Sequence, residues 1–231
     1  MINVKICGIQ HREDALVAAR AGFDLMGLVF VPQRRRRLEV AAAAEIVAHL
    51  RAAISNPPRM VGLFADQPLG EVNRVIKSCG LDLAQLCGQE SPDYARQVIA
   101  ESGAEVIKVL HVSVADTSGA ADASPRETDL EARLLRYREA GCHITLDRLV
   151  EGLQGGTGQS FDWEVAAGLS RKGHRFLLAG GLTPDNVAQA VAQVAPWGVD
   201  VSSGVETGGQ KDPAKIRSFI RNARSAAAGN S

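Results

Sequence analysis

Asp147 comes directly after an apolar run and directly before a glycine-rich stretch of the chain. The run beginning at Ile144 reads I-T-L-D, and G-G-T-G follows within ten residues or so, ahead of Phe161-Asp162-Trp163. In α/β proteins, catalytic groups are usually assembled at the carboxyl ends of strands, so a carboxylate at such an end is a candidate acid or base. A role in bracing the following loop is the equally weighted alternative for Asp147.

Other polar side chains lie at the ends of comparable apolar runs. Cys7 ends the first run, Arg36 lies beyond the second, and Gln85 and Cys87 lie at the end of the fourth. If these runs are parallel strands of one barrel, their carboxyl ends all lie at one face of the molecule. The sequence therefore predicts that these side chains gather at that face together with Asp147.

Two further loops are built from small residues. The last two apolar runs end in Gly180-Gly181 and in Ser202-Ser203-Gly204. Small residues let backbone N–H groups approach a ligand closely, and barrels commonly hold a phosphate between the loops after strands seven and eight, helped by the N-terminus of a short extra helix. We therefore predict a phosphate site at Gly180, Gly181, Ser202, Ser203 and Gly204, with simple tight turns as the alternative.

The elements that position these residues are short apolar runs separated by segments of helical periodicity. Ala, Leu, Val and Ile recur in those segments at helix-like intervals, as in Pro184 to Val194. Nearly continuous apolar runs are typical of parallel strands that are buried on both faces. We predict strands at Val4 to Cys7, Leu25 to Val31, Met60 to Phe64, Leu81 to Leu86, Val106 to Leu110, Cys142 to Leu146, Arg175 to Ala179 and Val199 to Ser202.

Eight strands that alternate with helices favour an α/β fold of the (β/α)8 TIM-barrel type. The strand starts recur about every 20 to 35 residues, which is the size of a βα unit. A doubly wound open sheet is the competing architecture. The regularity of the eight units and the absence of a G-x-G-x-x-G motif after the first strand favour the barrel.

The length and composition of the chain fit one globular domain. It has 231 residues, of which 45% are hydrophobic and 23% charged. The longest irregular stretch, Ser113 to Thr128, is rich in Ala, Ser, Asp and Gly, without a shift in composition that would mark a domain boundary. We predict a single barrel domain over residues 1–231, with a surface insertion at residues 113–128.

Charge and cysteine content narrow the choice of partners and compartment. Lysine plus arginine and aspartate plus glutamate each number 26, so the overall charge does not favour nucleic acid or an anionic membrane. Met1 to Gly8 is too short and polar for a secretory signal, and no apolar stretch approaches the roughly 20 residues that span a bilayer. We predict a cytoplasmic protein with no metal site and with reduced, widely spaced thiols at Cys7, Cys79, Cys87 and Cys142.

Five motifs carry a resemblance to a known family. They are K-I-C-G-I at Lys5 to Ile9, V-G-L-F at Val61 to Phe64, the G-G-T-G-x-x-F-D-W run, A-G-G-L-T-P-D-N-V at Ala179 to Val187, and G-V-D-V-S-S-G-V-E at Gly198 to Glu206. In this order, each at a different strand end, they resemble phosphoribosylanthranilate isomerase over nearly the whole chain. The resemblance implies the Amadori rearrangement of N-(5-phosphoribosyl)anthranilate in tryptophan biosynthesis, without a cofactor.

The resemblance also implies roles for individual residues. Asp147 matches the family's acid, which protonates the ring oxygen, and Cys7 matches its base, which removes the C2 proton. A thiol with an ordinary pKa near 8.5 must be made more acidic to act as a base at neutral pH, whereas a carboxyl group near 3.9 must be made less acidic to donate a proton. We therefore expect positive surroundings for Cys7, with Lys5 as one source, and hydrophobic or charge-crowded surroundings for Asp147.

Four residues are expected to bind substrate. Arg36 matches the family arginine that meets the anthranilate carboxylate, where a planar guanidinium pairs with a planar anion. It lies within a run of four arginines, and we expect Arg34, Arg35 and Arg37 to form a solvated loop, although a shift of one residue would give the role to a neighbour. Lys5, Gln85 and Asp200 are the other expected contacts. Asp200 has bracing of the last loops as its alternative role.

Two positions depart from the family pattern. The family commonly reads V-Q-L-H-G at the fourth strand, where this chain has Ala84-Gln85-Leu86-Cys87-Gly88. The family's G-G-T-G-K becomes G-G-T-G-Q, with Gln159 as the replacement. A histidine that faces the site and a loop cation are thereby absent at these positions, whereas the expected acid, base and phosphate loops are kept.

Two alternative functions stay open from the sequence alone. The first is another phosphosugar isomerase or epimerase on the same barrel, although Cys7 stands where the histidine-pathway isomerase would have its first aspartate. The second is a catalytically silent ligand-binding barrel or assembly subunit. The expected partner is a small phosphosugar, with no nucleic acid and no membrane, and the chain is expected to be a monomer or a homodimer.

Overall fold

The computed structural model describes residues 2–113, 125–149 and 163–229. Within these ranges, parallel strands form a closed barrel in the order β1 to β8, and β1 pairs with both β2 and β8 to close it. The strands are β1 (Asn3–Cys7), β2 (Leu25–Val29), β3 (Arg59–Phe64), β4 (Leu83–Leu86), β5 (Glu105–Ser113), β6 (His143–Leu149), β7 (Leu177–Leu178) and β8 (Gly198–Val201).

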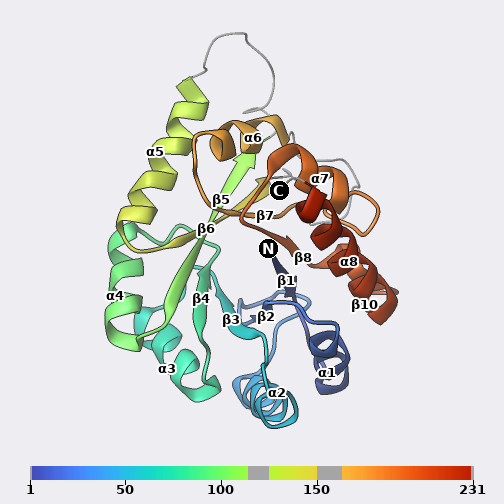
Figure 1. Cartoon of the computed structure of the whole chain (residues 1–231). Helices are drawn as coiled ribbons and strands as arrows, with labels where there is room; N and C mark the ends of the chain where they lie inside the picture. The colour runs from blue at the N-terminus through green and yellow to red at the C-terminus, as the bar shows by residue number, and fades with distance from the viewer. Residues whose placement is uncertain (1, 114–124, 150–162, 230–231) are drawn as a thin grey trace.

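Helices surround the strands on the outside of the barrel (Figure 1). They are α1 (Arg12–Arg20), α2 (Val40–Ala53), α3 (Leu69–Cys79), α4 (Pro92–Ser102), α5 (Pro125–Glu139), α6 (Trp163–Arg171), α7 (Val187–Val194) and α8 (Pro213–Gly229). Each strand is followed by one of these helices, so the predicted α/β TIM barrel is confirmed.

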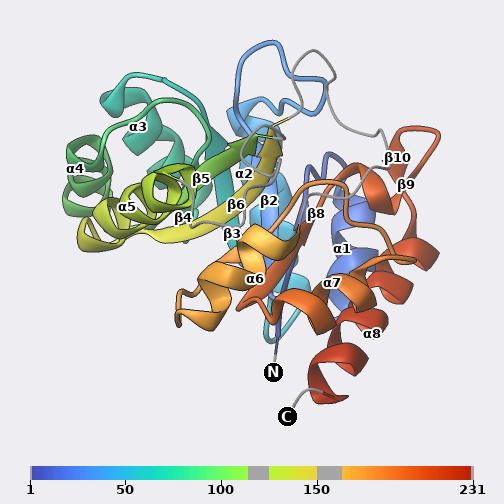
Figure 2. The same ribbon diagram turned by 90° about the horizontal axis from the view of Figure 1, so that it is seen from above.

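The region after β8 carries extra elements. A short 3-10 helix, η2 (Ser203–Val205), leads into the antiparallel hairpin of β9 (Glu206–Thr207) and β10 (Gln210–Lys211). In Figure 2 this hairpin extends beyond the barrel strands, at the edge of the molecule next to α8. Glu206 and Lys211 face each other across the hairpin, so their side chains start from paired positions.

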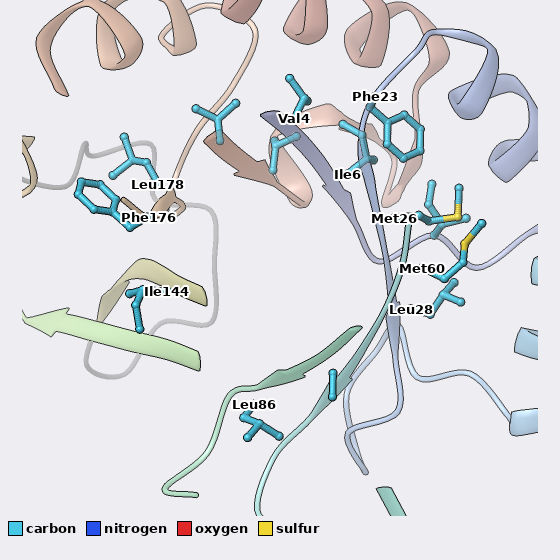
Figure 3. Close-up of a cluster of buried hydrophobic side chains, with 14 of the residues drawn as sticks. Val4, Ile6, Phe23, Met26, Leu28, Met60, Leu86, Ile144, Phe176 and Leu178 are labelled. Carbon is cyan, nitrogen blue, oxygen red and sulfur yellow. The ribbon is translucent and has the colours of Figure 1, made fainter. Parts of the chain in front are cut away.

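Side chains alternate between two sides of the barrel wall. Val4 and Ile6 of β1 belong to the large cluster between strands and helices, together with Met26, Leu86 and Ile144, as Figure 3 shows. Cys7 belongs to a separate, smaller cluster of side chains that point to the other side of their strands. Its other members are Leu25, Val29, Val61, Leu63, Leu83, Ile107 and Leu177. This second set lines the barrel interior, because successive strand residues point to opposite faces.

The predicted insertion lies mainly outside the described residues. β5 continues through Ser113 and α5 begins at Pro125, so the predicted range 113–128 overlaps both elements at its ends. A single domain over residues 1–231 stays a prediction. Among the described helices, none combines the length and apolar character that a bilayer crossing requires.

Candidate active site

The ion pair between Lys5 and Asp200 lies inside the barrel, next to Cys7. Lys5 lies beside Asp200 in the register between β1 and β8, and its Nζ donates to Asp200 Oδ2 at 2.7 Å. The Lys5 side chain is fully buried and that of Asp200 is 8% exposed. The second carboxylate oxygen of Asp200, Oδ1, has no hydrogen-bond partner among the described residues, so it can accept a hydrogen bond from a ligand.

The pKa of the Cys7 thiol is raised, although the expected positive surroundings were to make this thiol more acidic. Burial is the largest cause and raises this pKa, the charge of Lys5 lowers it, and the charge of Asp200 raises it again. Burial also acts to lower the pKa of Lys5, but the charges of Asp200 and Cys7 outweigh it and raise that pKa. The expected cation is therefore present, but its nearest carboxylate compensates its charge.

Gly27 on β2 leaves room for the thiol. It lies beside Cys7 in the register between β1 and β2, and a Cβ atom at position 27 would be 2.8 Å from Cys7 Sγ. The sequence alone does not show that glycine is needed at position 27, because the need arises from a contact between two strands.

Gln85 and Cys87 lie together at the end of β4. Gln85 is 4% exposed, and its Nε2 donates to Cys87 Sγ at 3.7 Å. Burial, followed by electrostatic coupling to the nearby Cys7, raises the pKa of Cys87 to about 12, so the Cys87 thiol is protonated at neutral pH. Gln85 Oε1 is buried without a hydrogen-bond partner among the described residues and can receive a donor from a ligand.

Asp147 lies beside His111 in the register between β6 and β5, and both side chains are partly buried. His111 points to the same side of β5 as Ile107, toward the barrel interior, and its Nε2 is 3.5 Å from the Cys87 carbonyl oxygen. Sequence reasoning missed this histidine, although its place at the end of the fifth strand was a usable signal. The glycine-rich run after Asp147, including Gln159, lies outside the described residues.

Arg36 is bound to a carboxylate from a distant part of the chain. Its Nε donates to Glu206 Oε1 at 2.7 Å and its Nη2 donates to Oε2 at 2.9 Å. Arg34, Arg35 and Arg37 are exposed, as expected of a solvated loop, but Arg35 also donates to Glu206 at 2.7 Å, and Arg37 pairs at 3.3 Å with the exposed Glu39. The arginine loop is fixed near its end, because Leu38 N donates to the Val29 carbonyl at 2.8 Å.

Burial raises the pKa of Glu206, but hydrogen bonds from Arg36 and Lys211 outweigh burial and lower it to about 2. Lys211 also donates to the Ser202 carbonyl at 2.9 Å. Sequence reasoning missed both Glu206 and Lys211 as site residues. No local pattern could have identified the first contact, because Arg36 and Glu206 are 170 positions apart.

The two predicted phosphate loops are in direct contact. A Cβ atom on Gly204 would lie 1.9 Å from the Leu182 carbonyl oxygen, so the loop after β8 packs against the loop that follows Gly180-Gly181. Ser203 begins η2, and the Ser202 hydroxyl donates to the Cys7 carbonyl at 3.2 Å. Within the described ranges, the amides of Gly181, Ser203 and Gly204 donate to no acceptor, so they can bind an anion.

The candidate groups therefore come from several strands but share one end of the barrel. Cys7 and Asp147 are not on neighbouring strands, because β7 and β8 separate β1 from β6 around the closed sheet. A ligand at this end would have the thiol and the carboxylate on different sides. This arrangement is suited to proton transfer at two separate atoms of a small molecule.

A closed α/β barrel with ionisable side chains and small-residue loops at the carboxyl ends of its strands defines the class of barrel enzymes. The family model described as N-(5'phosphoribosyl)anthranilate (PRA) isomerase matches residues 4–222. The isomerase of that name from Trichlorobacter lovleyi is 44% identical over 229 residues, which cover 98% of this chain and 100% of the relative. The chain belongs to the N-(5'-phosphoribosyl)anthranilate isomerase family, so the family and isomerase class predicted from the sequence are confirmed.

Two solved structures extend the comparison. One contains monomers generated from the dimeric isomerase of Thermotoga maritima, with a TM-score of 0.78 and 34% identity over 97% of this chain and 100% of that one. The other is the isomerase in complex with reduced 1-(o-carboxyphenylamino)-1-deoxyribulose 5-phosphate, with a TM-score of 0.78, 33% identity and the same coverage. Similar proteins therefore include monomeric and dimeric forms and a form with a bound phosphosugar derivative.

Proposed function

We propose that this chain converts N-(5'-phosphoribosyl)anthranilate into 1-(o-carboxyphenylamino)-1-deoxyribulose 5-phosphate, with Cys7 as the base and Asp147 as the acid. Membership of the family supports the reaction. The observation that carries the assignment of roles is the location of a buried thiol on β1 and a carboxylate on β6, at one end of the barrel and on non-adjacent strands. The reaction is a step of tryptophan biosynthesis and requires no cofactor.

The rearrangement needs one proton donor and one proton acceptor. Asp147 donates a proton to the ring oxygen as the C1–O bond breaks, while the nitrogen lone pair forms a C=N bond and gives a protonated Schiff base. Cys7 then removes the C2 proton, and the electrons of that C–H bond form the enolamine by neutralising the nitrogen. The enolamine tautomerises to the ketone.

The surroundings of Cys7 suit a base that acts only on bound substrate. Its raised pKa keeps the thiol protonated in the free protein, which protects it from side reactions. Lys5 and the positive charge of the Schiff base both favour the thiolate when substrate is present, and the thiol releases its proton to solvent before it takes the C2 proton. Asp200 Oδ1 and Gln85 Oε1 have no partner in the part of the chain that the structure describes, and they can accept hydrogen bonds from the substrate amine or hydroxyl groups.

The two anionic ends of the substrate are assigned to two regions of the site. Arg36 receives the anthranilate carboxylate, since its guanidinium retains N–H groups that Glu206 does not use. The phosphate binds the amides of the loops after β7 and β8, which include Gly180, Gly181, Ser202, Ser203 and Gly204. We also propose that the protein acts in the cytoplasm, where a catalytic thiol stays reduced, as a monomer or a homodimer.

The decay of substrate fluorescence tests this assignment directly. Freshly generated phosphoribosylanthranilate is mixed with wild-type protein, Cys7→Ala or Asp147→Asn, and turnover is expected to fall by about two orders of magnitude or more in each variant. Cys142→Ala is the matched control, because Cys142 is a buried thiol directly before the first residue of β6, in the cluster that faces the helices. Near-normal turnover in either site variant would refute that residue's role, whereas an inactive wild-type protein that binds a product analogue would indicate a binding function.

A further inference from the structure

Glu206 holds one complete edge of the Arg36 guanidinium. The contacts at 2.7 Å from Nε and 2.9 Å from Nη2 form a bidentate pair with the two carboxylate oxygens. Among the described residues, Arg36 makes no other hydrogen bond, so Nη1 and the second hydrogen of Nη2 stay available. The side chain of Glu206 is 6% exposed and that of Arg36 is 22% exposed, so the pair is shielded while the free edge can still meet a ligand.

Glu206 is itself fixed by two more cations. Lys211 Nζ lies 3.0 Å from Oε1, and Arg35 Nη2 lies 2.7 Å from Oε2. Three cations surround one carboxylate, so this cluster carries an excess of two positive charges. Glu206 therefore fixes the direction of Arg36 without cancelling the positive charge that an anionic substrate requires.

The stem of Arg36 is held from the other side. A Cβ atom on Gly8 would lie 2.4 Å from Arg36 Cδ, which means that the arginine stem packs directly on the residue after Cys7. Contact at the stem and at one guanidinium edge together restrict the rotamers of a long side chain. The remaining edge then has one preferred direction relative to the thiol.

We propose that Glu206 is a positioning residue that presents the free edge of Arg36 to the substrate carboxylate. The proposal rests on the assignment of Arg36 under the proposed function. A competing reading of the same contact is that Glu206 occupies Arg36 in place of the substrate. The two readings predict opposite changes in KM when the Glu206 charge is removed.

Glu206→Gln tests the proposal through the separation of KM from kcat. We expect KM to rise about tenfold and kcat to stay within about threefold, because the amide keeps the volume of the side chain but loses the paired charge. Glu206→Asp keeps the charge and shortens the reach, and its KM is expected to lie between those of wild type and Glu206→Gln. A KM that is unchanged or lower in Glu206→Gln would overturn the proposal.

A double variant shows whether Glu206 acts through Arg36. In an Arg36→Ala background, Glu206→Gln is expected to cause no further rise in KM, because the side chain to be positioned is absent. A further rise of similar size would mean that Glu206 acts through Lys211 and the Ser202 loop, and would overturn the proposal. An unchanged KM in Arg36→Ala alone would instead refute the assignment of Arg36, and an inactive wild-type protein would refute the proposed reaction.

Glu39→Gln is the matched control for the loss of charge. Glu39 is 77% exposed and pairs with the neighbouring Arg37, so its substitution removes a carboxylate from the same arginine loop without touching Arg36. Its KM is expected to match wild type. Circular dichroism and thermal unfolding establish that each variant is folded. If Glu206→Gln does not fold, Glu206→Asp carries the test, with a rise in KM of about threefold supporting the proposal and an unchanged KM overturning it.

Discussion

The charge of Lys5 is shared between two groups that it affects in opposite ways. Its contact with Asp200 at 2.7 Å satisfies one oxygen of a buried carboxylate, and its field favours the thiolate of Cys7. Because burial of the thiol outweighs that field, the pKa of Cys7 is raised. Asp200 adds to this rise, so the carboxylate that compensates Lys5 also keeps Cys7 protonated in the free protein.

Asp200→Asn is expected to make Cys7 more reactive. Removal of the carboxylate charge lowers the thiol pKa and leaves the charge of Lys5 uncompensated, while the amide oxygen can still accept the Lys5 hydrogen bond. Alkylation of Cys7 by iodoacetamide at pH 7 is expected to accelerate about threefold to tenfold, and its midpoint to move to lower pH. Mass spectrometry of the modified peptides measures both.

Cys79 provides an internal control in the same digest, since burial alone raises the pKa of that thiol. Its alkylation is expected to be the same in both proteins. An unchanged midpoint for Cys7 would mean that the Asp200 charge does not govern the thiol.

At the scale of single elements, the loop between β4 and α4 is held by a buried ion pair outside the barrel wall. Lys108 Nζ lies 2.8 Å from Glu90 Oε2 and donates to the Gly88 carbonyl at 2.6 Å, and the two side chains are 3% and 2% exposed. Glu90 Oε1 also accepts from the Asp66 amide at 2.9 Å. The pair thereby joins β5 to the loops after β3 and β4, next to Cys87.

Lys108→Met is expected to destabilise the fold by about 3 kcal/mol, because it leaves the Glu90 carboxylate buried without its cation. For a chain of this size, that loss lowers the unfolding temperature by about 6 to 12 °C. Thermal and urea unfolding measure the change. Arg96→Gln is the matched control, since the pair of Arg96 with Asp93 is 51% and 82% exposed, and its change is expected to stay within about 0.5 kcal/mol. A similar small change in Lys108→Met would contradict a stabilising role for the buried pair.

The strands were predictable from the sequence because nearly all of their side chains are buried and apolar. Barrel strands are buried on both faces, so runs such as Val4 to Cys7 and Leu25 to Val31 stand out, and they correspond to β1 (Asn3–Cys7) and β2 (Leu25–Val29). The second run was predicted two residues too long, since Phe30 and Val31 remain apolar after β2 ends and Phe30 N still donates to the Leu63 carbonyl at 3.0 Å.

The contacts of the site were less predictable than its residues. The strand-end rule predicted that Cys7, Gln85 and Asp147 gather at one end of the barrel, because it needs only the order of the elements. The rule could not identify the bond between Arg36 and Glu206, which depends on the path of two loops far apart in sequence. It also could not anticipate the raised pKa of Cys7, which depends on the depth of burial.

At the scale of the whole molecule, the charges balance in total but are unevenly distributed. The charges of the 26 basic and 26 acidic residues sum to zero, yet the cluster of Glu206 with Arg35, Arg36 and Lys211 carries an excess of two positive charges. Because the proposed substrate is anionic at both ends, this local field raises its rate of capture without any net charge on the protein.

The value of kcat/KM is therefore expected to fall about threefold to tenfold as salt rises from roughly 0.02 to 0.5 M, since salt screens this field. Arg35→Gln should weaken the salt dependence, because Arg35 is 57% exposed and contributes to the field at the surface. Arg171→Gln is the control, as Arg171 is 66% exposed but ends α6, at the opposite end of the barrel. Stopped-flow fluorescence measures all three proteins. Equal salt slopes in wild type and Arg35→Gln would argue against capture by this cluster.

The ion pairs between Arg35, Arg36 and Glu206 also affect how this barrel can acquire new specificities. Barrel enzymes diversify by replacement of loops at the carboxyl ends of strands, because the scaffold beneath them stays fixed. Here the loop after β2 and the hairpin of β9 and β10 share one buried carboxylate. A graft of the first loop alone would remove two of the three cations around Glu206. A graft of the hairpin alone would leave both arginines without their shared carboxylate. Chimeras of related barrels should therefore inherit these two loops from the same parent.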